Sequence, residues 1–165
     1  MTSELLFTGP ELCKFEAHEV VALLKAREIS SSDLIDAALT RIAQTGPLIN
    51  ATPTLCEAQA RAVDLSSRDS TPAGWLAGLP ITIKDLNAVA NVRTTFGTKG
   101  LADFIPQKSD PLVDQLEQRG AVILGKTNTP EFGAGGNTFN DVFGQTRNPW
   151  NTALNPGGPS GGAAA

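Results

Sequence analysis

The order of two short apolar segments and the helix between them is the strongest constraint on the fold of this chain. Residues 78–86 read GLPITIKDL, in which apolar and polar side chains alternate as they do along a β-strand. Residues 121–127, AVILGKT, are apolar up to the lysine, as in a strand that is buried on both faces. Between them, residues 109–120 read SDPLVDQLEQRG, a predicted helix with proline in its first turn and glycine at its end. Strand, helix and strand in this order predict a βαβ unit with a parallel sheet.

A helical segment precedes this unit and occupies most of residues 1–72. Its second helix has the clearest signals, because a run of serines can cap its first turn and Asp33 places a negative charge at the positive end of the helix dipole. Gly46 and Pro47 predict the end of that helix. Three helices are predicted here, over residues 16–28, 30–46 and 54–69.

The composition argues against two classes of partner. The formal net charge is −4 and the sequence pI is about 4.9. Since no run of basic residues offsets this charge, nucleic acid is not an expected partner. The longest apolar stretches fall well short of the roughly 20 residues that span a bilayer, so we expect no contact with a membrane.

Cysteine and histidine are too sparse for a zinc site. Cys13 and Cys56 lie far apart and His18 is the only histidine, whereas a structural zinc ion takes about four ligands. We therefore expect no metal and no cofactor. Two free thiols, expected to be buried, indicate a reducing compartment. The N-terminal residues lack the basic and apolar regions of a signal peptide, so we expect a cytoplasmic protein.

Residues 120–127, GAVILGKT, match the letters of a phosphate-binding loop, G-x-x-x-x-G-K-[ST]. The mechanism behind that motif needs a strand before the first glycine and a helix after the lysine. Here a predicted helix comes first, the middle residues form the strand itself, and Pro130 follows almost at once. We therefore reject a nucleotide site and place Lys126 at the end of a core strand.

Lys84, at the end of the first predicted strand, is a candidate general base. Partial burial of a lysine disfavours its charged form and lowers its pKa, so that the neutral amine can accept a proton. The alternative is a lysine that reaches solvent or pairs with a carboxylate, and spacing alone favours that alternative.

The C-terminal residues 155–165, NPGGPSGGAAA, also leave two interpretations open. Such a segment is either a flexible surface loop or a nest of backbone N–H groups around the hydroxyl of Ser160. Glycines at these positions would allow the backbone to approach a substrate closely.

Four stretches of the sequence together resemble the amidase signature family. They are LAGLPITIKDLNAVANVRTTFGTKGL, SDPLVDQLEQRGAVILGKTNTPEFG, GQTRNPWN and NPGGPSGGAAA, and they follow one another in the order of the family from about residue 74 to residue 165. The resemblance implies an α/β fold with a mixed central sheet flanked by helices. Residues 1–72 would be a helical lead-in, and residues 73–165 the start of the core of a single amidase domain.

The resemblance also implies a chemistry, the hydrolysis of an amide bond by a Ser–cis-Ser–Lys triad. A serine attacks the amide carbon, a second serine on a cis peptide bond relays the proton, and a lysine is the final base. Lys84 matches the lysine of the family in its GLPITIKD setting. The loop FGAGGN matches a segment that lines the substrate site, which assigns substrate contact to Gly133, Ala134, Gly135, Gly136 and Asn137.

Two departures from the family pattern affect this chemistry. The relay serine is replaced by Pro159, which has no hydroxyl to pass on a proton. An X–Pro cis bond costs only about 0.5–1 kcal/mol, so we predict that the Gly158–Pro159 bond keeps the cis geometry while Ser160, the neighbouring serine, remains a possible relay. The nucleophile of the family lies farther along than Ala165, so these 165 residues are expected to lack it and to be inactive alone.

Three functional alternatives remain. The first is the N-terminal part of an amidase that acts on a small-molecule amide. The second is a non-catalytic product or binding fragment, and the third is the glutaminase subunit of a tRNA-dependent amidotransferase. In each case exposed sheet edges would favour self-association of the isolated chain.

The rejection of a nucleotide site can be tested by titrating the chain with ATP. We expect no binding at micromolar ATP, because the residues between the two glycines form a strand whose amides serve the sheet. Micromolar affinity in isothermal titration, lost on Lys126→Ala, would show that the rejection is wrong.

Overall fold

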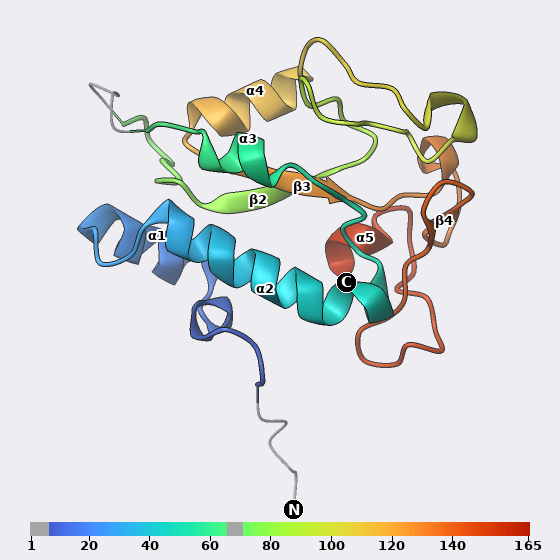
Figure 1. Cartoon of the computed structure of the whole chain (residues 1–165), viewed down its shortest axis with the longest axis horizontal. Coiled ribbons are helices and arrows are strands. Elements are labelled where there is room, and N and C mark those ends of the chain that lie inside the picture. The colour runs from blue at the N-terminus through green and yellow to red at the C-terminus, as the bar shows by residue number, and fades with distance from the viewer. Residues whose placement is uncertain (1–6, 66–70) are drawn as a thin grey trace, which may run out of the picture.

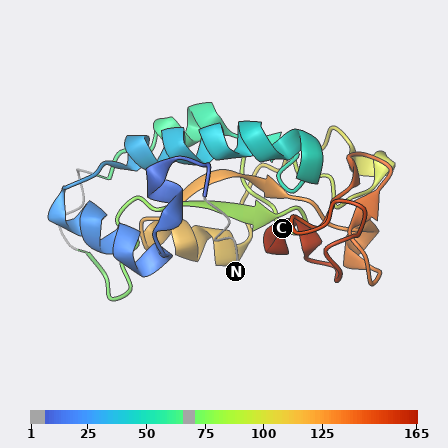
Figure 2. The ribbon, with the colours of Figure 1, turned by 90° about the horizontal axis from the view of Figure 1, so that it is seen from below.

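A three-stranded sheet with helices on both faces forms the centre of the protein. The computed structural model describes residues 7–65 and 71–165. The strands are β1 (Thr54–Leu55), β2 (Pro80–Lys84) and β3 (Val122–Thr127), in the order β1-β3-β2. Helix α4 (Pro111–Gln118) covers one face of the sheet, and α2 (Ser31–Ile49) crosses the other, as the two views show (Figures 1 and 2).

The predicted βαβ unit is confirmed. β2 pairs with β3 in parallel, and α4 connects them with Asp110 as its N-cap and proline in its first turn. Residues 120–127 match the letters of a phosphate-binding loop, but they consist of the turn after α4 and the buried strand β3. β1 pairs with β3 in the antiparallel direction, so the sheet is mixed, as the family resemblance implies.

Two apolar clusters lie on the two faces of this sheet. On the α4 side, buried valines and isoleucines from β2, β3, α4 and the loop after β2 pack together: Ile83, Val89, Val92, Val113 and Ile123. On the α2 side, side chains of α2, α3 and β3 form the second cluster: Ile35, Ala60, Val122 and Leu124. Successive residues of β3 thus point to opposite faces, which explains why the strand is apolar at every position up to its lysine.

The N-terminal helices follow their sequence signals at their starts. α1 (Ala17–Ala26) begins at a capping box, and its Val20 and Leu24 are buried. α2 begins at Ser30, whose side chain accepts from the Asp33 backbone N–H while the Asp33 carboxylate accepts from the Ser30 backbone N–H. This reciprocal pair satisfies two donors that a helix start leaves without partners. The predicted N-cap within the run of serines before Asp33 is confirmed, and the capping residue is Ser30.

The predicted end of α2 at Gly46 and Pro47 is wrong. The helix continues through Pro47 to Ile49, and Asn50 in the left-handed conformation closes its last turn by donating to the Gly46 carbonyl. A proline normally disfavours helix at the preceding residue, because its ring clashes with that residue's Cβ. Glycine has no Cβ, so Gly46 removes much of this conflict.

The predicted helix over residues 54–69 is also wrong in extent. Its first residues form the strand β1, and the helix α3 is confined to Glu57–Arg61. Residues 66–69 lie outside the described part of the chain. The Cys56 N–H donates to the Leu124 carbonyl, so this stretch follows the edge of β3 because pairing with the sheet outweighs local helix propensity.

Beyond β3 the chain has only short regular elements. They are η3 (Glu131–Gly133), β4 (Phe139–Asn140), β5 (Gly144–Gln145) and α5 (Gly161–Ala164), and earlier short turns are η1 (Glu11–Lys14) and η2 (Lys99–Leu101). α5 lies beside the carboxyl ends of β2 and β3 (Figure 1), which is where parallel sheets place their functional groups.

Gly125 in β3 is required where β1 pairs with that strand. A Cβ at this position would lie 2.5 Å from the Thr54 carbonyl oxygen, and backbone cannot yield as a flexible side chain does. Gly125→Ala should therefore lower the free energy of unfolding by about 1–3 kcal/mol. Gly100→Ala is the control, because a Cβ there meets only the Thr98 Oγ1 at 3.9 Å, so the free energy of unfolding should change by less than about 0.5 kcal/mol. Urea unfolding measures both, and equal effects of the two variants would contradict this packing.

Candidate active site

The structure brings together two side chains that are 76 positions apart in the sequence. Lys84 is the last residue of β2, and its Nζ donates to the Ser160 Oγ at 2.8 Å. Lys84 is half-buried and Ser160 is exposed just before α5. The two sequence candidates for proton transfer therefore form one polar pair at the carboxyl edge of the sheet.

Burial makes the charged form of Lys84 less favourable than it is for a lysine in water. Burial lowers the pKa of Lys84 from its ordinary value, because a charged amine loses hydration as it leaves water. A lysine with a lowered pKa that contacts a hydroxyl can accept a proton from it. The geometry therefore supports the interpretation of Lys84 as a base over that of a lysine paired with a carboxylate.

Two buried threonines hold the segment that carries Ser160. The Thr138 Oγ1 donates to the Gly158 carbonyl at 2.9 Å and accepts from the Gly161 N–H at 2.8 Å. The Thr129 Oγ1 donates to the Pro159 carbonyl at 3.3 Å. Residues on both sides of Ser160 are thus tied to the protein, so this segment is not a free surface loop.

The paired glycines after Ser160 allow α5 to dock closely. A Cβ on Gly161 would lie 2.5 Å from the Thr138 Oγ1, and one on Gly162 would lie 2.4 Å from the Asn128 backbone nitrogen. Both glycines are buried. Because they lack a Cβ, α5 can approach the Thr138 side chain and the Asn128 backbone closely, which fixes the start of α5 and with it the position of Ser160.

The expected cis bond before Pro159 is not present. The described residues contain no cis peptide bond, so Gly158–Pro159 is trans. The chain turns here through two successive left-handed glycines, Gly157 at φ 76° and Gly158 at φ 62°. Because glycine adopts this conformation at little cost, the turn forms with the lower-energy trans isomer. Pro159 itself is exposed.

A cleft of about 470 Å³ includes residues on either side of Thr138, the threonine that holds Gly158 and Gly161, but neither Lys84 nor Ser160 lines it. Four of the five predicted substrate-site residues line it, namely Ala134, Gly135, Gly136 and Asn137, together with Gly97, Thr98 and Lys99 from the loop that follows β2. The fifth, Gly133, does not line the cleft. Gly133 instead packs against Leu86, because a Cβ on Gly133 would lie 2.5 Å from the Leu86 Cδ1.

Sequence reasoning missed the polar residues that connect the cleft with Ser160. Asn128 is fully buried, donates to the Gly144 carbonyl and the Thr146 Oγ1, and accepts from the Asn140 side chain. With Thr129 and Thr138 it forms the support beneath residues 158–161. The available signal was the TNT run directly after the apolar strand, where polar residues at a parallel strand's carboxyl end commonly serve a site.

Comparison with known proteins identifies the family of this chain. A family profile described as Amidase matches residues 33–165, which include Lys84, the cleft residues 134–137 and Ser160. This chain belongs to the amidase family. The fold class expected from the resemblance is thereby established, as an amidase-signature α/β fold of which this chain comprises a portion.

Three similar proteins illustrate the range of the family. A glutamyl-tRNA(Gln) amidotransferase subunit of Dehalococcoides mccartyi is 40% identical over 158 residues, which cover 94% of this chain and 32% of the relative. A bacterial aryl acylamidase has a TM-score of 0.81 with 35% identity, covering 92% of this chain and 32% of that chain. A 6-aminohexanoate cyclic dimer hydrolase has a TM-score of 0.80 with 32% identity, covering 90% and 30%. This amidase-family chain spans about a third of the length of each.

The part of the chain that the structure describes has neither a membrane-spanning helix nor a metal cluster. Within residues 7–65 and 71–165 no helix has both the length and the apolar character needed to cross a bilayer. The same residues contain no cluster of three or more acidic, histidine or cysteine side chains that could hold a metal ion.

The lowered pKa of Lys84 can be measured by competitive acetylation. Acetic anhydride reacts with neutral amines, so we expect Lys84 to react at lower pH than the exposed Lys25 of α1 in the same sample. Peptide mass spectrometry gives the rate at each position. A Lys84 profile that coincides with that of Lys25 across the pH range would contradict the proposed neutral base.

Proposed function

We propose that this chain supplies the general base and the substrate loop of an enzyme that hydrolyses carbon–nitrogen amide bonds. The products are a carboxylate and ammonia or an amine. The observation that carries the proposal is the 2.8 Å contact between the Lys84 Nζ and the Ser160 Oγ, at the carboxyl edge of the sheet in a member of the amidase family. The substrate is a small-molecule amide bound at the cleft beside residues 134–137.

In this proposal Ser160, rather than Pro159, passes protons to the base. The nucleophilic serine, outside these 165 residues, loses its proton to Ser160 as it attacks the amide carbon, while Ser160 gives its own proton to neutral Lys84. The protonated Lys84 then returns a proton through Ser160 to the leaving nitrogen, which completes acylation. Water then attacks the acyl-serine, gives its proton to Lys84 through the same relay, and releases the carboxylate while the serine regains its proton. Support comes from the hydroxyl of Ser160 at hydrogen-bond distance, since Pro159 has none.

Residues 1–165 alone would then contain a base, a relay and a substrate loop without the attacking group. We expect no turnover from them in isolation. A product of this length that has only a binding role remains the alternative from another functional class, and Pro159 in place of the relay serine is the observation that favours it.

A second candidate within the family is a glutaminase that feeds ammonia to a tRNA-dependent amidotransferase. The 40% identity to the Dehalococcoides mccartyi amidotransferase protein, over 94% of this chain, favours it. Against it, the structural agreement with the corresponding protein of Thermotoga maritima is lower, with a TM-score of 0.71, than with the two amide hydrolases. We therefore prefer a general amidase that acts on a small amide.

A chimera tests the proposal. Residues 1–165 are joined to the part of the bacterial aryl acylamidase that follows the matched region, and release of the aromatic amine from an anilide is followed. Lys84→Met should lower kcat by about 10²–10⁴-fold, the usual contribution of a general base, and Ser160→Ala should have an effect of similar size. Lys25→Met and Pro159→Ala are the controls and should retain most of the activity.

The outcomes separate the parts of the proposal. A chimera that keeps its kcat after Lys84→Met would rule out Lys84 as the base. Ser160→Ala without effect, together with a large gain on Pro159→Ser, would return the relay to position 159. Release of ammonia from glutamine with no reaction of anilides would favour the glutaminase.

A further inference from the structure

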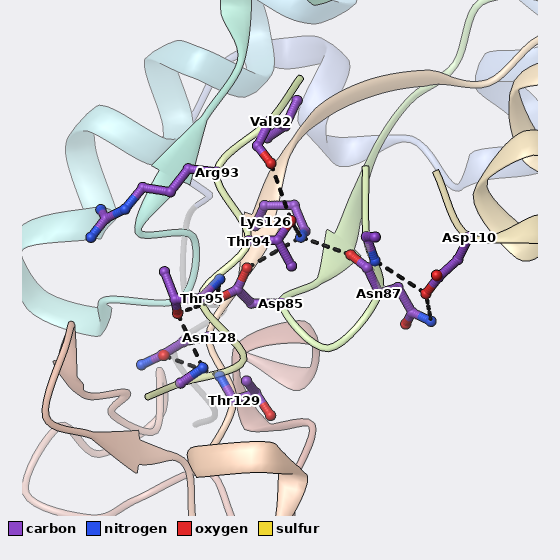
Figure 3. Close-up of polar contacts among 12 residues, drawn as sticks. Asp85, Asn87, Val92, Arg93, Thr94, Thr95, Asp110, Lys126, Asn128 and Thr129 are labelled. Carbon is purple, nitrogen blue, oxygen red and sulfur yellow. Dashed lines mark hydrogen bonds and ion pairs between the residues drawn. The ribbon is translucent and has the colours of Figure 1, made fainter. Parts of the chain in front are cut away.

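Lys126 is a lysine with no exposure to solvent. Its side chain is 0% accessible, and its Nζ donates to the Asn87 carbonyl at 2.8 Å, to the Thr94 Oγ1 at 2.7 Å and to the Asp85 Oδ1 at 3.2 Å (Figure 3). An ammonium group has three N–H donors, and all three have partners here. The amine is therefore held from three directions by one segment, residues 85–94.

The partner carboxylate is equally enclosed. Asp85 is 1% exposed, and its second oxygen accepts from the backbone N–H of Thr95 at 3.1 Å and from the Thr95 Oγ1 at 2.6 Å. The ion pair and its hydrogen bonds thus join β3 to both ends of residues 85–95. Buried ion pairs gain little net stability over well-packed apolar replacements of similar size.

Lys126 contacts two residues of the turn that follows Lys84 at the end of β2. Asp85, its ion-pair partner, is the residue directly after Lys84, and the Asp85 N–H donates to the Thr127 carbonyl. Asn87, whose carbonyl accepts from Lys126, donates its own N–H to the Lys84 carbonyl at 2.9 Å. The backbone on the carboxyl side of Lys84 is therefore fixed by groups that Lys126 holds.

The strand register keeps the two lysines on opposite faces of the sheet. A shift in the pairing of β2 with β3 places Ile83 opposite Lys126 and Lys84 opposite Thr127. Paired positions of a parallel ladder share a face, and successive residues alternate. Lys126 therefore lies on the α4 face with Ile83, while Lys84 points to the face where Ser160 lies.

We propose that Lys126 is a positioning residue, which locks the end of β2 from the interior so that the Lys84 amine is held against Ser160. It never contacts Ser160 and acts through the backbone of residues 84–87. The proposal rests on the role of Lys84 proposed above.

Other charged or titratable groups near Lys126 are few. Burial lowers the pKa of Lys126, and Asp85, with smaller contributions from Asp110 and Cys56, acts in the opposite direction. For Lys84, burial alone accounts for the lowered pKa. A loosened β2 end would therefore change Lys84 through its exposure to water rather than through a new charge.

Competitive acetylation of residues 1–165 provides the test. In the Lys126→Met variant, the end of β2 is released, Lys84 leaves Ser160 and gains water, and its charged form is favoured. We expect the midpoint of the Lys84 rate–pH profile to rise by about half a pH unit or more, which leaves about threefold less neutral amine below the midpoint. Leu24→Ala, which removes a buried side chain of α1, is the control for general loss of stability and should leave the profile in place.

Each result bears on the proposal. A rise of the Lys84 midpoint in Lys126→Met, without a rise in Leu24→Ala, supports the proposal. An unchanged Lys84 profile in a folded Lys126→Met protein, judged by circular dichroism, overturns it, and so does an equal rise in both variants. If Lys126→Met does not fold, Thr94→Val takes its place, because valine is nearly the size of threonine but has no hydroxyl to accept from Lys126. We then expect a smaller rise of the Lys84 midpoint, and an unchanged midpoint overturns the proposal.

The unaltered chain offers a measurement that needs no substitution. Lys126 should remain unacetylated at the pH values at which Lys25 reacts, because its three N–H groups are bound inside. Acetylation of both at similar rates would show that the pair opens in solution and would overturn the proposal. None of these measurements depends on turnover, so a failed activity test of Lys84 and a failed test of Lys126 can be told apart.

Discussion

An ammonium group enclosed by protein must find all of its hydrogen-bond acceptors there, and Lys126 finds three in one segment. Asp85, Asn87 and Thr94 surround its Nζ. Loss of one of these hydrogen bonds would leave a buried polar group unpaired, which is costly in free energy. Residues 85–95 therefore have little freedom to move relative to β3. The turn after Lys84 is held by this arrangement, because Asn87 also donates its N–H to the Lys84 carbonyl.

The same part of the molecule uses glycine to bring separate segments into close contact. Gly125 admits β1 against β3, while Gly161 and Gly162 admit α5 against Thr138 and Asn128. In each place a Cβ would lie 2.4 or 2.5 Å from a neighbouring atom. Close approach on both sides of the strand's end explains how an exposed serine can be positioned by a short helix of four residues. Residues 157–162, GGPSGG, therefore contribute to the site through the small size of their glycines as well as through the Ser160 hydroxyl.

Local signals predicted a large part of the fold. The βαβ unit, the capping of α2 by Ser30 and the Pro111 start of α4 were predicted because each depends on residues close together in sequence. The errors occurred where distant contacts decide. Residues 54–55 form a strand because β3 offers them partners, and α2 passes Pro47 because Gly46 lacks the Cβ that would clash. The cis bond at Pro159 was wrong because two left-handed glycines make the turn instead.

The candidate site shows the same division. The sequence by itself determined which groups are available: Lys84 at a strand's end, Ser160 among glycines, and a proline without a hydroxyl at position 159. Only the tertiary structure decided that Lys84 and Ser160 meet, and that Lys126 at the end of its core strand forms an ion pair with Asp85 in the interior. The physical reason is that hydrogen-bond partners and burial depend on segments far apart in the chain, and no short window of sequence contains both sides of such a contact.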